Sequence, residues 1–263
     1  YSATISGSGS AGVATFQVET KREHLVPVLD LFQQMLREPR LPKQEFEVIQ
    51  RQQITGLESA LTDPGALASN RLRRAFNKYP KDHVLYEPTI AEKIDRWKAV
   101  KLDDVVKLHE EYLSAAKGEL AIVGDFERGA VEKILGETFA EWTTKTEYAR
   151  IPDDAPTGIK GSTSTILTPD KANAFYLAAT RFPMTDSHED YAGLMIGNFV
   201  FGGGSLASRL GDRVRQQEGL SYGVGSFFRA DPIDANAQFA IQAIANPNAK
   251  DKLTAVIREE LEK

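Results

Sequence analysis

The chain has 263 residues, 41% of them hydrophobic and 26% charged, values near the averages of soluble globular proteins that exclude disorder, collagen-like and coiled-coil architectures. A formal net charge of -5 and the absence of a long Lys/Arg cluster argue against a nucleic-acid partner. The chain has no cysteine, which excludes disulfides, thiolate nucleophiles and cysteine-ligated metals, and it has no apolar run long enough to span a membrane.

The first part of the chain predicts one strand followed by a series of helices. Residues 13–20 alternate between apolar and polar side chains, as a half-buried strand does. Residues 22–37 carry an apolar stripe at helical spacing. Further helices are predicted over residues 43–60, 66–79, 90–97, 101–113 and 128–139. The run E-L-A-I-V-G at residues 119–124 predicts a short buried strand.

Residues 148–161 have the composition of a linker, rich in Pro, Gly and Asp. They include Asp153 and Asp154, a carboxylate pair that this composition assigns to a solvated surface. We therefore expect a domain junction here, which gives domains 1–152 and 153–263. The chain lacks an initial Met and stops inside a helical pattern, so we expect the first domain to miss its N-terminal part and the second its C-terminal part.

Beyond the junction, strands and helices follow one another in a new series. Strands are predicted over residues 162–167, 174–182, 220–228 and 237–245, and helices over 189–201, 206–217 and after Pro247. The last two strands are expected to pair. This order suits an α+β layer with helices over a mostly antiparallel sheet.

No set of catalytic residues is recognisable from local spacing. None of the four histidines, His24, His83, His109 and His188, lies within a helical turn of another, so neither H-E-x-x-H nor H-x-x-E-H occurs. There is also no G-x-S-x-G elbow and no phosphate-binding Walker loop. We therefore expect no metal site and no peptidase activity in this chain alone.

The most informative stretch is residues 201–226, F-G-G-G-S-L-A-S-R-L-G-D-R-V-R-Q-Q-E-G-L-S-Y-G-V-G-S. Gly202, Gly203 and Gly204 permit backbone geometry that side chains would forbid, and Ser205 can cap the helix that follows. This helix carries several arginines, and the strand after it holds Tyr222.

This stretch resembles the C-terminal-type domain of the insulinase/pitrilysin family of zinc metallopeptidases. The family pattern is a glycine-containing loop, then S-R-L, then an Arg separated by six residues from a Tyr, in a phrase such as R-E-x-x-G-L-A-Y. The matching residues here are S-R-L at 208–210, Arg215 and Tyr222. Weaker similarity to the family, at residues 30–42, at Asp63-Pro64 and over 100–125, covers most of the rest of the chain.

The resemblance implies a mitochondrial-processing-peptidase-like α+β fold of two tandem similar domains, each a mostly antiparallel sheet with helices packed on one face. It also implies a division of labour between two halves that close on a peptide or protein substrate. One half holds zinc, and the other contributes the Arg/Tyr pair, here Arg215 and Tyr222 as catalytic residues. Gly202, Gly203, Gly204 and Ser205 would bind substrate. The zinc-bearing half would lie in the same longer polypeptide or in a separate subunit. Residues 50–56, Q-R-Q-Q-I-T-G, stand where active domains supply a glutamate ligand, so the chain itself needs no cofactor.

Other interpretations use the same residues differently. Arg215 and Tyr222 could brace the turn between helix and strand, with the glycine run as a tight connection. The chain could also be a non-proteolytic peptide-binding or assembly scaffold of the same fold, although such a scaffold has no need of both residues. An independent metal hydrolase built from scattered His and carboxylate side chains is a third class. The sequence leaves the compartment open between bacterial periplasm and cytoplasm.

Overall fold

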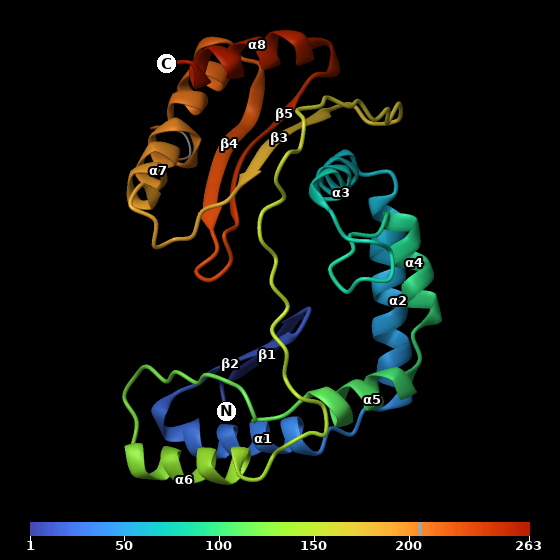
Figure 1. The fold of residues 1–263 in the computed structure, drawn as a ribbon, viewed down its shortest axis with the longest axis vertical. Helices are drawn as coiled ribbons and strands as arrows, with labels where there is room; N and C mark the ends of the chain where they lie inside the picture. Colours follow the sequence, from blue (N-terminus) through green and yellow to red (C-terminus); the bar gives the residue numbers. More distant parts are fainter. Residues whose placement is uncertain (205–206) are drawn as a thin grey trace. The chain divides into compact units, whose positions relative to one another are not determined.

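The computed structural model describes residues 1–204 and 207–263 (Figure 1). Its contacts form two compact units, one of residues 1–53 and 97–151, the other of residues 54–96 and 152–263. Helix α2, Lys43–Ala60, contributes residues to both units. The division into domains 1–152 and 153–263 stays a prediction, and the contact grouping differs from it by placing residues 54–96 with the later part of the chain.

The first unit is built on two packed helices and a hairpin. Strands β1 (Thr4–Ser10) and β2 (Val13–Glu19) pair antiparallel, and the turn uses Gly12 at φ +79°, where a side chain would be strained. A short 3-10 turn, η1 (Arg22–His24), leads into α1 (Leu25–Arg37). Helix α1 packs on α6 (Arg128–Phe139) through Leu29, Val131 and Ile134. The unit also contains α5, Leu102–Tyr112.

The strand predicted at residues 119–124 is wrong. These residues form no strand, and the side chain of Val123 is 97% exposed. An apolar run becomes a strand only when a neighbouring strand supplies hydrogen bonds, and β1 and β2 pair with each other alone within the described residues. The strand predicted at residues 162–167 is wrong as well, because that segment has no strand partner and is mostly exposed.

Two helices that begin in the second unit have side-chain caps at their first turns. At the start of α3 (Pro64–Phe76), the Asp63 carboxylate accepts a hydrogen bond from the Ala66 amide at 2.7 Å. At α4 (Ile90–Ala99), Thr89 and Glu92 form a reciprocal capping box. Helix α3 packs against strand β3, with Gly65 close to the Phe175 ring.

The sheet of the second unit has three antiparallel strands in the order β3-β5-β4. They are β3 (Ala174–Phe182), β4 (Ser221–Ala230) and β5 (Ala237–Ala245). The helical segments that follow β3 and β5 are α7 (Tyr191–Asn198), η2 (Phe199–Gly203), η4 (Gly211–Gln217), η5 (Pro247–Ala249) and α8 (Lys250–Leu261). Figure 1 shows α7 and α8 on the same side of this sheet. The expected α+β fold with antiparallel strands and packed helices, including the pairing of the last two strands, is confirmed.

The core of the second unit lies between this sheet and the helical segments. Its buried side chains are Phe201, Leu210, Val214, Ile241, Ala243, Ala245, Leu253, Val256 and Ile257. Val214 belongs to η4 and is fully buried, so η4 is held against the sheet along one side. Both η2 and η4 are π-helical, a form that often occurs at functional sites. Within residues 1–204 and 207–263, no helix has both the length and the apolar character required to cross a membrane.

Candidate functional site

Arg215 and Tyr222 lie together at the point where η4 connects to β4. The Arg215 guanidinium carbon is 4.5 Å from the centre of the Tyr222 ring, within the range of a cation–π contact. The tyrosine is 85% exposed and the arginine is partly exposed. The two side chains predicted to form a pair are therefore in contact, and they are open to solvent within the second unit.

A β-bulge sets the position of Tyr222. Ser221 pairs with Ala245 and Gly223 pairs with Ile244, so Tyr222 is an extra residue opposite no partner on β5. The buried Ser221 hydroxyl lies 2.9 Å from the Gly223 carbonyl oxygen and 2.6 Å from the Ile244 carbonyl oxygen. A bulge redirects the extra side chain, which here leaves the tyrosine ring in solvent beneath Arg215.

The three arginines of this region have different surroundings. Arg209 donates hydrogen bonds to the Glu260 carboxylate and backbone carbonyl, at 2.9 and 2.8 Å. Arg213 forms ion pairs with Glu218 and Glu259. Arg215, by contrast, has no carboxylate partner in the part of the chain that the structure describes. Its positive charge is therefore available to a ligand.

Glu218 and Glu260, which pair with Arg213 and Arg209, have lowered pKa values that favour their ionised forms. A hydrogen bond from Lys252, helped by the charge of Arg213, lowers the pKa of Glu218 below its ordinary value. The pKa of Glu260 is lowered by a hydrogen bond from Lys263 and a second one from Arg209. These contacts fasten η4 to α8 and leave Arg215 on the other side of η4.

The glycine run, residues 202–204, lies where other parts of the chain come too close for a side chain. A Cβ on Gly202 would lie 2.5 Å from the Ser226 hydroxyl and 2.7 Å from its backbone nitrogen, so η2 and β4 approach each other too closely for a side chain. A Cβ on Gly204 would lie 2.8 Å from the Phe199 carbonyl oxygen. Gly202 is buried, whereas Gly203 is exposed. Ser205, the remaining predicted substrate-binding residue, lies outside the described residues.

The described residues offer no ligand set for zinc. Among the described residues, no group of three or more His, Cys, Asp or Glu side chains could hold a metal ion. The histidines have structural contacts: His109 donates from its ring to the Leu36 carbonyl at 2.8 Å, and His83 stacks on the Tyr79 ring. Gln50, in the stretch where active domains have a glutamate, donates from its amide to the Trp97 and Val100 carbonyls at 2.8 and 2.9 Å. A carboxylate has no hydrogen to donate there.

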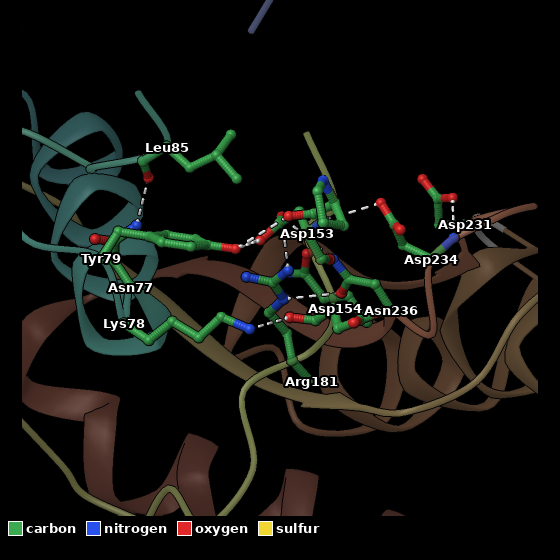
Figure 2. Close-up of polar contacts among 12 residues, drawn as sticks. Asn77, Lys78, Tyr79, Leu85, Asp153, Asp154, Arg181, Asp231, Asp234 and Asn236 are labelled. Carbon is green, nitrogen blue, oxygen red and sulfur yellow. Dashed lines mark hydrogen bonds and ion pairs between the residues drawn. The ribbon is translucent and has the colours of Figure 1, made fainter. Parts of the chain in front are cut away.

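Figure 2 shows a polar cluster of the second unit that the sequence did not predict. The Asp153 carboxylate accepts hydrogen bonds from the Tyr79 hydroxyl at 3.1 Å and from Arg181 at 3.2 Å, and Asn236 donates to the Asp153 backbone carbonyl at 2.6 Å. Burial, together with the hydrogen bond to Asp153, raises the pKa of Tyr79. Asp154 accepts from the Ala235 amide. The expectation of a solvated surface therefore fits the exposed Asp154 but is wrong for Asp153, which is partly buried and joins its segment to Arg181 and Asn236 at the end of the β3–β5 pair.

Comparison with solved structures shows the same fold in bacterial proteins. A peptidase M16 inactive domain from Pseudomonas fluorescens matches with a TM-score of 0.81 and 24% identity, over 99% of this chain and 61% of that one. A protease from Helicobacter pylori matches with a TM-score of 0.80 and 16% identity, over 98% of this chain and 62% of that one. The periplasmic protease PqqL from Escherichia coli matches with a TM-score of 0.68 and 16% identity, over 99% of this chain and 28% of that one.

The sequence pattern described as "Peptidase M16 inactive domain" matches residues 99–263. The chain belongs to this family, and it is a non-catalytic half of the insulinase/pitrilysin type of metallopeptidase-like protein. No curated protein sequence matches it. It spans less than two thirds of the length of the bacterial structures that it resembles.

Proposed function

We propose that this chain is the substrate-binding half of a zinc metalloendopeptidase and that Arg215 and Tyr222 donate hydrogen bonds to the peptide being cleaved. One observation carries the proposal: Arg215 has no acidic partner in the described chain and stacks on a tyrosine that is 85% exposed. If the pair only braced the turn, its polar groups would be expected to face the chain rather than solvent.

The stacked arrangement suits hydrogen bonding to a substrate. A guanidinium that lies over a ring keeps its N–H groups at its rim, where they can reach a carbonyl oxygen. The Tyr222 hydroxyl is a second donor beside it. When a peptide carbonyl is attacked, its oxygen gains negative charge, and each well-placed donor to that oxyanion contributes about 2.7–4 kcal/mol to the transition state. The zinc that activates the attacking water is assigned to the partner half.

The neighbouring sheet edge offers a place for the rest of the substrate. Strand β4 lies at one edge of the order β3-β5-β4, and Tyr222 lies near its start. An extended peptide can add to such an edge through backbone hydrogen bonds. Gly203 and Gly204 are assigned to this binding surface, and Gly202 supports it by letting η2 pack directly on β4.

The test is reconstitution of the chain with its cognate zinc-bearing half, the one that contains H-x-x-E-H. The probe is a mixture of fluorescence-quenched decapeptides, and each half is first assayed alone. We expect cleavage only when both halves and zinc are present. Tyr222→Phe keeps the ring beneath Arg215 but removes the hydroxyl donor, so it should lower kcat about 10²- to 10³-fold without changing the melting temperature.

Two results would count against this proposal. Cleavage by the isolated chain would place the chemistry within it, and a Tyr222→Phe enzyme with the wild-type kcat would remove the tyrosine from the site. Tight binding of the peptides with no cleavage in any combination would instead favour the non-proteolytic scaffold. Fluorescence anisotropy with the same peptides measures that binding directly.

A further inference from the structure

The bulge at the start of β4 contains a polar side chain that the family phrase does not require. The phrase R-E-x-x-G-L-A-Y has alanine before the tyrosine, whereas this chain has Ser221. We propose that Ser221 is a positioning residue, which closes the bulge and so holds Tyr222 beneath Arg215. This inference deepens the proposed function and rests on it for its catalytic consequence, but not for its structural one.

The hydroxyl of Ser221 is placed to repair the interrupted strand ladder. Between the pairs Ser221–Ala245 and Gly223–Ile244, the bulge leaves backbone groups without their regular partners. The Ser221 hydroxyl lies 2.6 Å from the Ile244 carbonyl oxygen across the ladder and 2.9 Å from the Gly223 carbonyl oxygen beyond the bulge. A hydroxyl has one hydrogen, so the two carbonyls share it. Alanine would leave both carbonyls without this donor.

The position of Tyr222 depends on the bulge because side chains alternate between the two faces of a strand. If the extra residue were absorbed by a one-residue slip, Tyr222 would take a place in the ladder and point in another direction. The Arg215 side of the contact is fixed independently. The Leu220 amide donates to the Val214 carbonyl at 2.9 Å, and Val214 is fully buried. Movement at the bulge therefore separates the tyrosine ring from the guanidinium.

Ser221 has no features of a nucleophile. It is only 6% exposed, and its hydroxyl is directed at two carbonyl oxygens. No hydrogen bond joins it to a histidine or a carboxylate within the described residues, so no base is positioned to take its proton. Its contribution acts through Tyr222.

The experiment compares Ser221→Ala with Ser221→Thr, which keeps a hydroxyl, and with Ser226→Ala. Ser226 is a matched control because it lies on the same strand, is 8% exposed and donates to the Asn198 side chain at 2.8 Å, away from the bulge. The first readout is the NMR chemical shift of the Arg215 side chain, measured in arginine-labelled protein. The nearby Tyr222 ring displaces this shift. The Tyr222→Leu variant gives the chemical shift of the Arg215 side chain in the absence of the ring. The Arg215→Lys variant identifies the Arg215 signal, because this signal disappears from its spectrum.

We expect Ser221→Ala to move the Arg215 signal toward its Tyr222→Leu position, while Ser226→Ala leaves it unchanged and Ser221→Thr restores it. In the reconstituted enzyme, Ser221→Ala should lower kcat about 5- to 30-fold with KM within about twofold, the pattern of an interaction made in the transition state. An unchanged Arg215 signal in Ser221→Ala would overturn the inference. Because this signal needs no partner half, the inference can fail or hold whether or not reconstitution gives cleavage.

Discussion

The two sides of η4 differ in how they use arginine. On the side facing α8, Arg213 is surrounded by acidic groups, with Glu218, Glu259 and Glu260 all within 4.0 Å. On the side facing the start of β4, Arg215 contacts an aromatic ring and no carboxylate in the described chain. The two residues are separated by one buried position, Val214, and all three lie on η4.

This difference separates a structural arginine from one that is available to a ligand. The acidic groups around Arg213 satisfy its charge and join η4 to α8. Among the described residues, the charge of Arg215 meets the face of Tyr222 and no carboxylate, which leaves its N–H donors available. The comparison therefore predicts opposite consequences for the two arginines: removing Arg213 should affect stability, and removing Arg215 should affect function.

The largest expected effect comes from Arg215→Ala. With the zinc-bearing half present, this variant should lower kcat about 10²- to 10³-fold, because it removes a donor to the developing oxyanion. Its melting temperature should stay within about 1 °C of the wild type, since no ion pair is lost and surface substitutions of this kind are nearly neutral. Steady-state kinetics and calorimetry on the same preparation measure the two quantities.

Arg215→Lys is the matched control for charge. A lysine keeps the positive charge but not the planar fork that stacks on Tyr222, so only part of the activity should return. Full activity in Arg215→Lys would mean that charge alone matters. A large drop in melting temperature for Arg215→Ala would make Arg215 a structural residue like Arg213 and would remove the contrast.

The second effect concerns the packing that supports both sides of η4. Gly202→Ala should destabilise the second unit by about 1–3 kcal/mol or more, because its Cβ would collide with the Ser226 backbone nitrogen and a Leu210 methyl group. Gly197→Ala on α7 is the control, since nothing lies within 4 Å of its Cβ, and it should be neutral or slightly stabilising. Urea unfolding followed by circular dichroism compares them. Equal stability of the two variants would contradict the close approach of η2 and β4.

Sequence patterns predicted most of the helices and the paired strands because their signals are local. The helix predicted over residues 66–79, which the structure has as α3 from Pro64 to Phe76, and the alternation of residues 237–245 are examples, since helical and period-two patterns depend on neighbouring residues only. The strands predicted at 119–124 and 162–167 failed because a strand depends on a distant partner, which no local pattern specifies. The hairpin strand β1 was missed because its T-I-S-G-S-G-S sequence is poor in the apolar residues that mark a strand.

The candidate site was predictable only in part. The order of Gly run, Arg215 and Tyr222 identified the pair, but the sequence did not indicate which arginine on η4 lacks an acidic partner. That distinction depends on Glu218, Glu259 and α8 folding against the same segment. The role of Asp153 was also missed, because its partners Arg181 and Asn236 are far away in the sequence. Gly223, a glycine inside the predicted strand and next to Tyr222, was an available signal for the bulge.

Arg213→Ala should have a smaller effect than Gly202→Ala, and it should act on stability alone. We expect the melting temperature to fall by about 2–4 °C, because Glu218 keeps Lys252 as a partner and the ion pair of Arg213 with the exposed Glu259 contributes little. The activity of the folded, reconstituted enzyme should equal that of the wild type. Raised salt should shrink the difference in melting temperature by screening the lost pairs. Loss of turnover in Arg213→Ala without loss of stability would reverse the assignment of the two arginines.

The smallest expected effect is a difference in the acid dependence of stability. Glu218 and Glu260 have pKa values below the ordinary 4.5, the first through Lys252 and Arg213 and the second through Lys263 and Arg209. A lowered folded-state pKa means that the unfolded chain binds more protons in this range, so stability is present above pH 4.5 and is lost as the pH falls below it.

Urea unfolding at several pH values between 6 and 3 measures how steeply the free energy of unfolding falls with acid. This slope should differ between variants of Arg213 and Arg215. Arg213→Ala should show a shallower loss of stability with acid than the wild type, because one cation that lowers the Glu218 pKa is gone. Arg215→Ala should lose stability with acid as steeply as the wild type, because the structure describes no ion pair between Arg215 and either Glu218 or Glu260. If both variants flattened the slope equally, the charge of Arg215 would be coupled to the same acidic groups, and it would no longer be free to meet a substrate carbonyl.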